Sequence, residues 1–220
     1  MALNPHLIPV RKDPEIIRNE VLTNFSKMFA ERGYINKSNI KRAQQDFAKL
    51  SDNDVYIIKL DKPIIPENTS NEYVKKFNSD IVAIKIIHQK ILGIAKVPAV
   101  KEFVDEYNNC HKVFIFESIS DKAKMSLTSI PNTEVFTEGF LMINLVDHID
   151  SPKYEVLSED EIKEVLESYL VKRKELPKIL TTDPVVSYFN LKRGQILRVI
   201  RCSEQSGYAI IYRIVAKGAN

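Results

Sequence analysis

The pattern of apolar and polar residues predicts that helices and strands alternate along the first two thirds of the chain. The stretch from Asp13 to Gly33 has the signals of a helix, because an Asp-Pro pair opens it and a glycine ends it. Its apolar residues recur at helical spacing and form one stripe, made of Ile17, Val21, Phe25, Met28 and Phe29. A second helix is expected after Ser38, with an inner face of Ile40, Ala43, Phe47 and Leu50.

Short apolar runs between these helical stretches are typical of buried strands. They cover residues 55–60, 81–87, 113–116 and 140–146, and the second run is almost continuously apolar, as expected for a sheet covered on both faces. A helix is expected to open at Pro98, with inner residues Val100, Phe103, Val104 and Tyr107. Residues 120–129 predict a polar turn or a short helix. Because helices alternate with buried strands, the first part of the chain is predicted to be an α/β domain.

The last third has a different pattern, which predicts a small α+β domain. Ser158 and Glu161 have the spacing of a capping box, in which the serine caps a helix and the glutamate reaches back to it. The apolar positions that follow fit one helix, namely Ile162, Val165, Leu166, Tyr169 and Leu170. Residues 176–179 are expected to be extended because of Pro177. The run Lys172-Arg173-Lys174 is interpreted either as a solvated helix end or as a basic contact surface.

A short helix and a hairpin are predicted near the end of the chain. Asp183 and Pro184 suit the cap and first position of a helix whose apolar side would hold Val185, Val186, Phe189 and Leu191. Asn190 stands where a left-handed residue is expected, and residues 192–194 fit a tight turn. The β-branched runs 195–201 and 208–215 predict a hairpin whose loop needs a positive φ at Gly207. A linker is expected over residues 148–153. The chain is therefore predicted to consist of a flexible arm (1–14), an N-terminal domain (15–147) and a C-terminal domain (148–220).

Composition limits what the chain can bind. Its 220 residues include 32 basic and 29 acidic side chains, so the net charge of +3 predicts no general attraction to nucleic acid, and any DNA contact must come from a local cluster. Two cysteines give no disulfide framework, which favours an intracellular protein. No apolar run approaches the roughly 18 residues of a membrane span. We therefore expect a soluble protein that does not bind a membrane.

The last third of the chain contains a series of short motifs. They are Asp183-Pro184-Val185, Leu191-Lys192-Arg193-Gly194, Ile200-Arg201, Ser203-Glu204, Ser206-Gly207 and Tyr212-Arg213. In this order they resemble the assembly domain of the fifth subunit shared by eukaryotic nuclear RNA polymerases, and of its archaeal equivalent. The chain departs from the family at Asn190, where a glycine is frequent, and at Tyr208, where a basic residue is frequent.

The resemblance extends into the N-terminal part through Glu31-Arg32-Gly33-Tyr34, Ser129-Ile130-Pro131 and Leu145-Val146-Asp147-His148. It implies that residues 15–147 form the jaw domain, which the archaeal equivalent lacks. The chain would then be of the eukaryotic type, or a version encoded by a large DNA virus. Its location would be the nucleus or, for a viral protein, the cytoplasmic virus factory or the virion.

The resemblance implies a non-catalytic subunit of a multisubunit DNA-directed RNA polymerase, with no cofactor and no metal. The C-terminal domain would dock on the largest subunit and meet other polymerase subunits, and the N-terminal domain would form the lower jaw near downstream duplex DNA. The residues implied at the subunit interface are Leu191, Lys192, Arg193, Gly194, Arg198, Arg201, Ser203, Glu204, Gly207, Tyr212 and Arg213. A family segment near DNA aligns with Ser120-Asp121-Lys122-Ala123, so Ser120, Lys122 and Lys124 are the DNA-proximal candidates.

Alternatives from other classes rest on weaker patterns. Val82-Ala83-Ile84-Lys85 matches a kinase strand motif, but no glycine occurs between Gly33 and Gly93 to form the phosphate-binding loop. A stand-alone Mg²⁺-dependent nuclease would use Asp80 and Lys85, yet Ala83 occupies the place of the second carboxylate. Cys110-His111 has no second pair at the spacing of a zinc site. A free DNA-binding module is disfavoured by the nearly neutral charge.

Overall fold

The computed structural model describes residues 13–47, 55–65, 76–93, 97–144, 146, 151–203 and 207–218. The expected arm up to residue 12 and residues 148–150 of the expected linker lie outside these ranges. The chain forms two compact units, Met1–Ile143 and Asn144–Asn220, and each contains its own four-stranded sheet. The mixed α/β fold expected from the sequence is confirmed.

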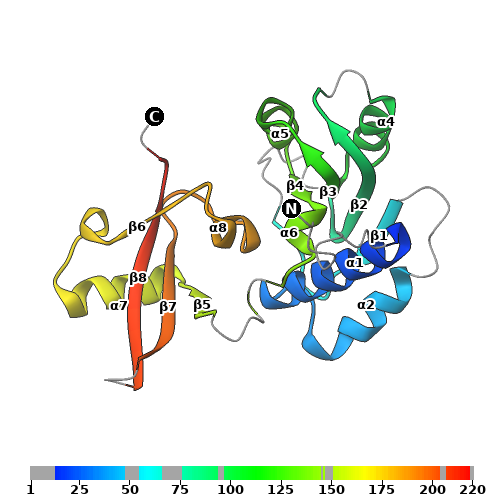
Figure 1. Ribbon diagram of the computed structural model, residues 1–220. Helices are drawn as coiled ribbons and strands as arrows, with labels where there is room; N and C mark the ends of the chain where they lie inside the picture. The colour runs from blue at the N-terminus through cyan, green and yellow to red at the C-terminus, as the bar shows by residue number, and fades with distance from the viewer. Residues whose placement is uncertain are drawn as a thin grey trace, which may run out of the picture. The chain divides into compact units, whose positions relative to one another are not determined.

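The sheet of the first unit has the strand order β1-β2-β3-β4 (Figure 1). Its strands are β1 (Val55–Lys59), β2 (Asn78–Ile91), β3 (Cys110–Ile119) and β4 (Thr133–Thr137). β1 runs antiparallel to β2, whereas β2, β3 and β4 are parallel to one another. The middle of β2, with Val82, Ala83, Ile84 and Ile86, is buried, which explains the apolar run seen there in the sequence.

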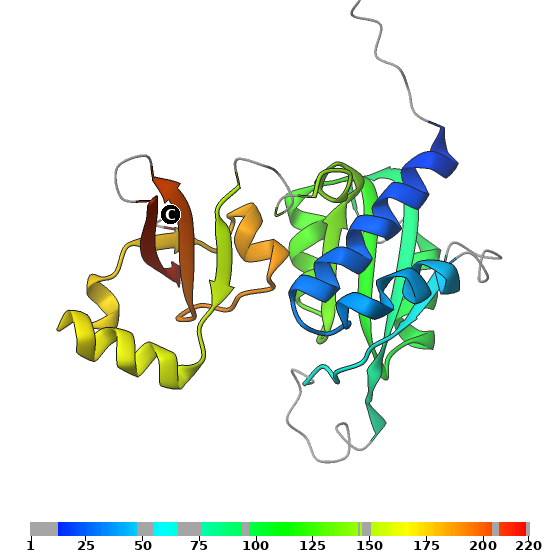
Figure 2. The ribbon, with the colours of Figure 1, turned by 90° about the horizontal axis from the view of Figure 1, so that it is seen from below.

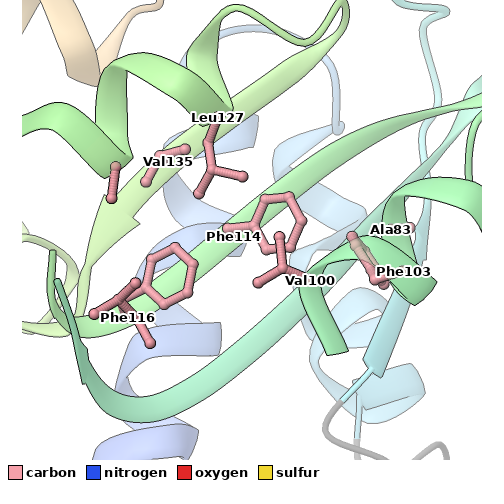
Figure 3. Close-up of a cluster of buried hydrophobic side chains, with 9 residues drawn as sticks. Ala83, Val100, Phe103, Phe114, Phe116, Leu127 and Val135 are labelled. Carbon is pink, nitrogen blue, oxygen red and sulfur yellow. The ribbon is translucent and has the colours of Figure 1, made fainter. Parts of the chain in front are cut away.

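Helices cover both faces of this sheet. α1 (Pro14–Glu31), the short 3-10 helix η2 (Lys37–Asn39), α2 (Ile40–Phe47) and α6 (Glu138–Leu141) lie on one face, and α4 (Pro98–Glu106) and α5 (Asp121–Thr128) lie on the other (Figures 1 and 2). Under α4 and α5, Phe114 packs edge-on against Phe103 at 5.1 Å between ring centroids, with Leu127 and Val135 alongside (Figure 3). The predicted helices that open at Pro14 and Pro98 are confirmed, and residues 120–129 contain a helix.

Two details of the prediction for this unit are wrong. The fourth strand was expected over residues 140–146, but it is β4 and lies earlier, at Thr133–Thr137. Residues 138–141 form the helical turn α6. β4 contains the polar residues Thr133 and Glu134, which are buried, so an apolar pattern could not reveal it. Ser38 lies inside η2 rather than at a helix cap, and α2 begins at Ile40. Leu145, Leu50 and the side chains of Ala43 and Phe47 lie outside what the structure describes.

The sheet of the second unit has the order β5-β7-β8-β6. Its strands are β5 (Lys153–Val156), β6 (Lys178–Leu180), β7 (Ile196–Ser203) and β8 (Gly207–Ala216). β7 and β8 form the predicted antiparallel hairpin, in which Ser203 pairs with Gly207. Gly207 has a φ of +73°, so the expected positive φ is confirmed. β6 runs parallel to β8 and pairs with residues 214–216 alone.

Two helices pack on opposite faces of the hairpin. One face places Ile196, Tyr212 and Ile214 against α7 (Glu159–Tyr169), while the other places Leu197, Val199 and Val215 against α8 (Pro184–Tyr188). The helix signals read from the sequence are confirmed. Ser158 and Glu161 form the capping box, the Asp183 carboxylate accepts from the Val185 N–H at 2.8 Å, and Asn190 has a φ of +49°.

One detail of the prediction for α7 is wrong. Leu170 was expected to belong to the helix, but it lies just beyond the end of α7, and Tyr169 and Leu170 are 59% and 92% exposed. The helix ends at Tyr169, and Leu170 adopts a left-handed conformation with a φ of +54° that turns the chain away. The chain then continues through the 3-10 helix η4 (Arg173–Glu175) into β6.

Candidate functional site

The half of the hairpin nearest its loop leaves apolar side chains open to solvent. Tyr208 and Ile210 of β8 are 70% and 52% exposed, and Arg201 and Cys202 of β7 are exposed as well. The cores under α7 and α8 take their strand residues from the other half, from Ile196 to Val199 and from Tyr212 to Val215. We call residues 200–203 and 207–211 the distal hairpin. Glu204, which was predicted at the interface, and Ser206 of the Ser206-Gly207 motif lie outside the described residues.

An edge of β8 is also open in the part of the chain that the structure describes, because no strand pairs with residues 209–213 on the side away from β7. The Ile214 N–H donates to the Pro177 carbonyl of the β6 segment at 2.9 Å, so Ile214 directs its main chain to that side. Main-chain groups alternate in direction along a strand, and therefore Ile210 and Tyr212 direct theirs to the open edge.

Most of the basic residues predicted for an interface lie on the surface of this unit. Arg201 and Arg213 are exposed and, by their register, lie on the same face of the hairpin as Leu197. Lys192 and Arg193 are exposed in the turn before β7, where the Gln195 side chain accepts from the Lys192 N–H at 2.5 Å. Gly194 follows with a φ of +89°. Several positive charges thus surround the hairpin without being part of its core.

Two predicted interface residues have clear roles inside the unit. Arg198 Nη1 donates to Glu155 Oε2 at 3.1 Å, and its guanidinium lies 5.7 Å from the centre of the Tyr212 ring. Glu155 also binds Lys153, and the hydrogen bonds from Lys153 and Arg198 lower the pKa of its carboxyl group. Arg198 therefore ties β5 to the hairpin. Leu191 is buried in the core under α8, so it supports the hairpin from within.

The DNA-proximal candidates come together at the start of α5 in the first unit. The Ser120 N–H donates to the Ile91 carbonyl at 2.9 Å, and its hydroxyl donates to the Leu92 carbonyl at 3.0 Å, so Ser120 joins the ends of β2 and β3. The same hydroxyl caps α5 by accepting from the Ala123 N–H at 3.3 Å. Lys122 and Lys124 follow on the helix, and both are exposed. The structure thus presents two lysines on a short, capped helix.

The residues of the alternative sites do not converge. Ala83 is fully buried under α4 and α5, Asp80 is exposed, and Lys85 is half-buried. Cys110 and His111 point to opposite faces of β3, and burial raises the pKa of the Cys110 thiol. Among the described residues, no group of three His, Cys, Asp or Glu side chains is placed to hold a metal ion. Within the same residues, no helix is long and apolar enough to cross a membrane.

Sequence reasoning missed a buried network of charges in the first unit. Arg32 Nη1 and Nη2 donate to the two carboxylate oxygens of Glu134, both at 2.9 Å, and His111 Nε2 lies 2.8 Å from Glu134 Oε1. Burial alone would raise the pKa of Glu134, but the charge of Arg32 and the hydrogen bond with His111 outweigh it and lower the pKa to about 2. The network joins the end of α1 to β3 and β4. Its members are far apart in the sequence, so no motif could have shown it.

Comparison with known proteins adds an independent observation on the second unit. Residues 143–215 match the family defined as the C-terminal domain of RNA polymerase Rpb5. The chain is 34% identical over 142 residues to "DNA-directed RNA polymerase subunit 5" of Acanthamoeba polyphaga mimivirus, a match that covers 64% of this chain and 69% of that protein.

Cellular relatives give a similar result. The chain is 34% identical over 128 residues to "DNA-directed RNA polymerases I, II, and III subunit RPABC1" of Caenorhabditis elegans and of Caenorhabditis briggsae. Each of these matches covers 56% of this chain and 61% of the nematode protein. These relatives are subunits of a DNA-directed RNA polymerase, so the chain is classed with accessory subunits of a larger enzyme rather than with enzymes that act alone. The chain belongs to the family of subunit 5 of DNA-directed RNA polymerase.

Proposed function

We propose that this subunit docks on the largest polymerase subunit through its C-terminal unit, and that its N-terminal unit forms the lower jaw beside downstream duplex DNA. The exposed distal hairpin is the observation that supports docking most strongly, since it lies in the region that matches the Rpb5 family. The protein would be located in the nucleus or, if it is viral, in the virus factory or the virion, because its relatives are both viral and eukaryotic.

The open edge of β8 suggests how the docking occurs. Natural proteins usually protect a free edge with charged residues, prolines or bulges, and an unprotected edge can take up a strand from another chain. Ile210 and Tyr212 stand at this edge, while Arg201 and Arg213 lie on a flanking face. A strand of the largest subunit that carries apolar side chains next to acidic ones would pair with β8 and cover Tyr208 and Ile210.

Proline substitution at the edge tests the docking mode. The N–H of Ile210 points away from β7, so Ile210→Pro removes a hydrogen-bond donor from the open edge while the ladder between β7 and β8 keeps its bonds. We expect its recovery with the co-expressed largest subunit to fall by about tenfold. Ile210→Thr is the matched control, because it retains the N–H and β-branching but loses apolar area, and it should reduce recovery less.

Folding of both variants is checked by thermal unfolding of the full chain. A folded Ile210→Pro variant that is recovered as well as the wild type would overturn docking through the β8 edge. If both Ile210 variants and the double variant Arg201→Glu/Arg213→Glu were all recovered normally, the docking of this unit on the largest subunit would itself be wrong.

The DNA contact is tested separately in the assembled polymerase. Lysines that contact phosphates displace counterions, so each phosphate interaction that Lys122→Ala/Lys124→Ala removes should lower the salt dependence of the complex by roughly one unit of slope. Sequence preference should not change, because such lysines read no base edges. The measurement is the half-life of elongation complexes against salt, with Lys101→Ala on α4 as the exposed control. Identical curves for the double variant and the wild type would show that α5 does not face DNA.

A further inference from the structure

A small hollow opens on the first unit between α2 and β1, on the face of the sheet opposite α5. Its volume is about 130 Å³. Ile35, Ile58 and Leu60 form its floor, and their exposed fractions are only 3%, 1% and 5%. Because the floor is made of aliphatic side chains that already belong to the core, the hollow keeps its shape, and at its bottom these side chains expose a small apolar area that one incoming side chain can contact.

The rim of the hollow is polar, and the carboxylate that lines it is already engaged. Asp61 accepts from the Asn36 N–H at 2.7 Å and from the Asn39 side-chain amide at 3.0 and 3.1 Å. The hydrogen bonds from Asn36 and Asn39, together with the nearby charge of Arg42, lower the pKa of Asp61. This carboxylate therefore stays ionised and fixes η2 against the end of β1.

The remaining charges at the rim are positive. Arg42 of α2 and Lys59 of β1 both line the hollow, and both are exposed. Lys41 and Lys62 are exposed next to them in the sequence. Among the described residues, Asp61 is the only acidic one that lines the hollow, and its oxygens accept from Asn36 and Asn39. A carboxylate on a partner would therefore meet an excess of positive charge here.

We propose that this hollow binds an acidic peptide segment of another protein, with one large aliphatic or aromatic side chain of the segment on the floor and its carboxylates against Arg42 and Lys59. A nucleic acid fits less well. Single strands bind mainly by stacking their bases on aromatic side chains, and the described residues that line the hollow include no aromatic side chain. The ionised Asp61 at the rim also repels a phosphate, whereas a peptide can direct its carboxylates to the two cations and its apolar side chain to the floor.

The test uses the full chain and a synthetic peptide of alternating aspartate and leucine. A peptide with serine in place of leucine keeps the charge and removes the apolar anchors. We expect the leucine peptide to bind and to shift the amide signals of Ile35, Asn39 and Leu60. Arg42→Glu and Lys59→Glu should each weaken binding by about fivefold or more, as loss and reversal of an ion pair predict. Lys101→Glu, an exposed reversal on the opposite face of the sheet, should leave the affinity unchanged.

Three outcomes would overturn this inference. Equal affinity for the serine peptide would mean that the basic rim attracts any anion and that the floor is not used. A short DNA duplex that shifts the same amide signals with higher affinity would assign the surface to nucleic acid. If the leucine peptide does not bind, or binds without shifting the amide signals of the floor residues, the hollow is not a peptide-binding site. Each substitution is at an exposed position, so an unchanged amide spectrum of the free variant confirms that folding is intact.

Discussion

Each unit is built on a four-stranded sheet, but the two units place their charges differently. In the first unit, Arg32, Glu134 and His111 are bonded together inside the protein, with side-chain exposed fractions of 2%, 10% and 5%. In the second, the ion pair between Glu155 and Arg198 lies at the surface of the sheet, with exposed fractions of 31% and 25%. The first unit uses charge to lock elements that are distant in the sequence, whereas the second keeps most of its charge outside, where another molecule can meet it.

This difference has an energetic meaning. A charge that loses its partner in the interior remains unsolvated, so breaking a buried pair is costly even where the intact pair adds little stability. At the surface, water takes the place of the lost partner, and the same change has a small effect. The comparison therefore predicts that equivalent substitutions will affect the two units unequally.

The largest expected effect comes from Glu134→Ala. It leaves Arg32 buried without its carboxylate, and we expect the first unit to lose about 3–5 kcal/mol of unfolding free energy. The matched change Glu155→Ala should cost the second unit about 1 kcal/mol or less. Urea unfolding of the full chain, followed through amide signals of each unit, separates the two results. Equal losses in both units would break the comparison.

Acid should also destabilise the first unit through its buried ion pair. The pKa of Glu134 in the folded state, about 2, lies below its ordinary value of 4.5. Its ionised form therefore adds stability that is fully present above about pH 4.5 and is lost as the pH falls towards 2, with a total of about 3 kcal/mol. We expect Glu134→Gln to flatten the acid dependence of the first unit, measured as unfolding free energy against pH. An unchanged dependence would show that another group dominates it.

A smaller effect is expected in the hairpin loop. Gly207→Val forces a residue with a β-carbon into a φ of +73°, which should cost the second unit about 1–3 kcal/mol. Among the described residues, no atom lies within 4 Å of a β-carbon built at this glycine, so backbone strain is the effect that the substitution is designed to measure. Gly93→Val is the control, because no atom of the described residues lies within 4 Å of its β-carbon either and its φ is not positive. Equal melting temperatures for the two variants would contradict this explanation.

The smallest expected effect comes from removing a helix cap, which can be compared between the two units. Ser158 caps α7 through its side chain, and Ser158→Ala should cost about 1 kcal/mol. Thr137 stands at the cap of α6 but makes no side-chain cap bond, so Thr137→Ala should cost less from capping. Thermal unfolding read from each unit provides the measurement. A larger loss at Thr137 would show that position in the helix, rather than the hydrogen bond, determines the cost.

The sequence predicted local structure well and distant side-chain pairings poorly. Caps at Ser158 and Asp183, the left-handed Asn190 and the hairpin all depend on neighbouring residues, and all are confirmed. β4 was missed because Glu134 is buried by virtue of Arg32, a partner 102 residues away. Arg198 and Glu155 are also distant in the sequence, so the sequence could not show whether Arg198 pairs within the unit or contacts another subunit. Leu170 was assigned to the helix because helical spacing does not show where a helix ends.

A consequence for mutational scans follows from the packing of α7 and α8 on opposite faces of the same two strands. Even-numbered residues such as Ile196, Tyr212 and Ile214 report on the core under α7, and odd-numbered ones such as Leu197, Val199 and Val215 report on the core under α8. A scan along β7 should therefore alternate between two independent phenotypes. Deletion of a single residue there would exchange the two sets, because each side chain after the deletion would move to the other face. A single substitution in β7 should therefore disturb one of the two cores, whereas a one-residue deletion should disturb both.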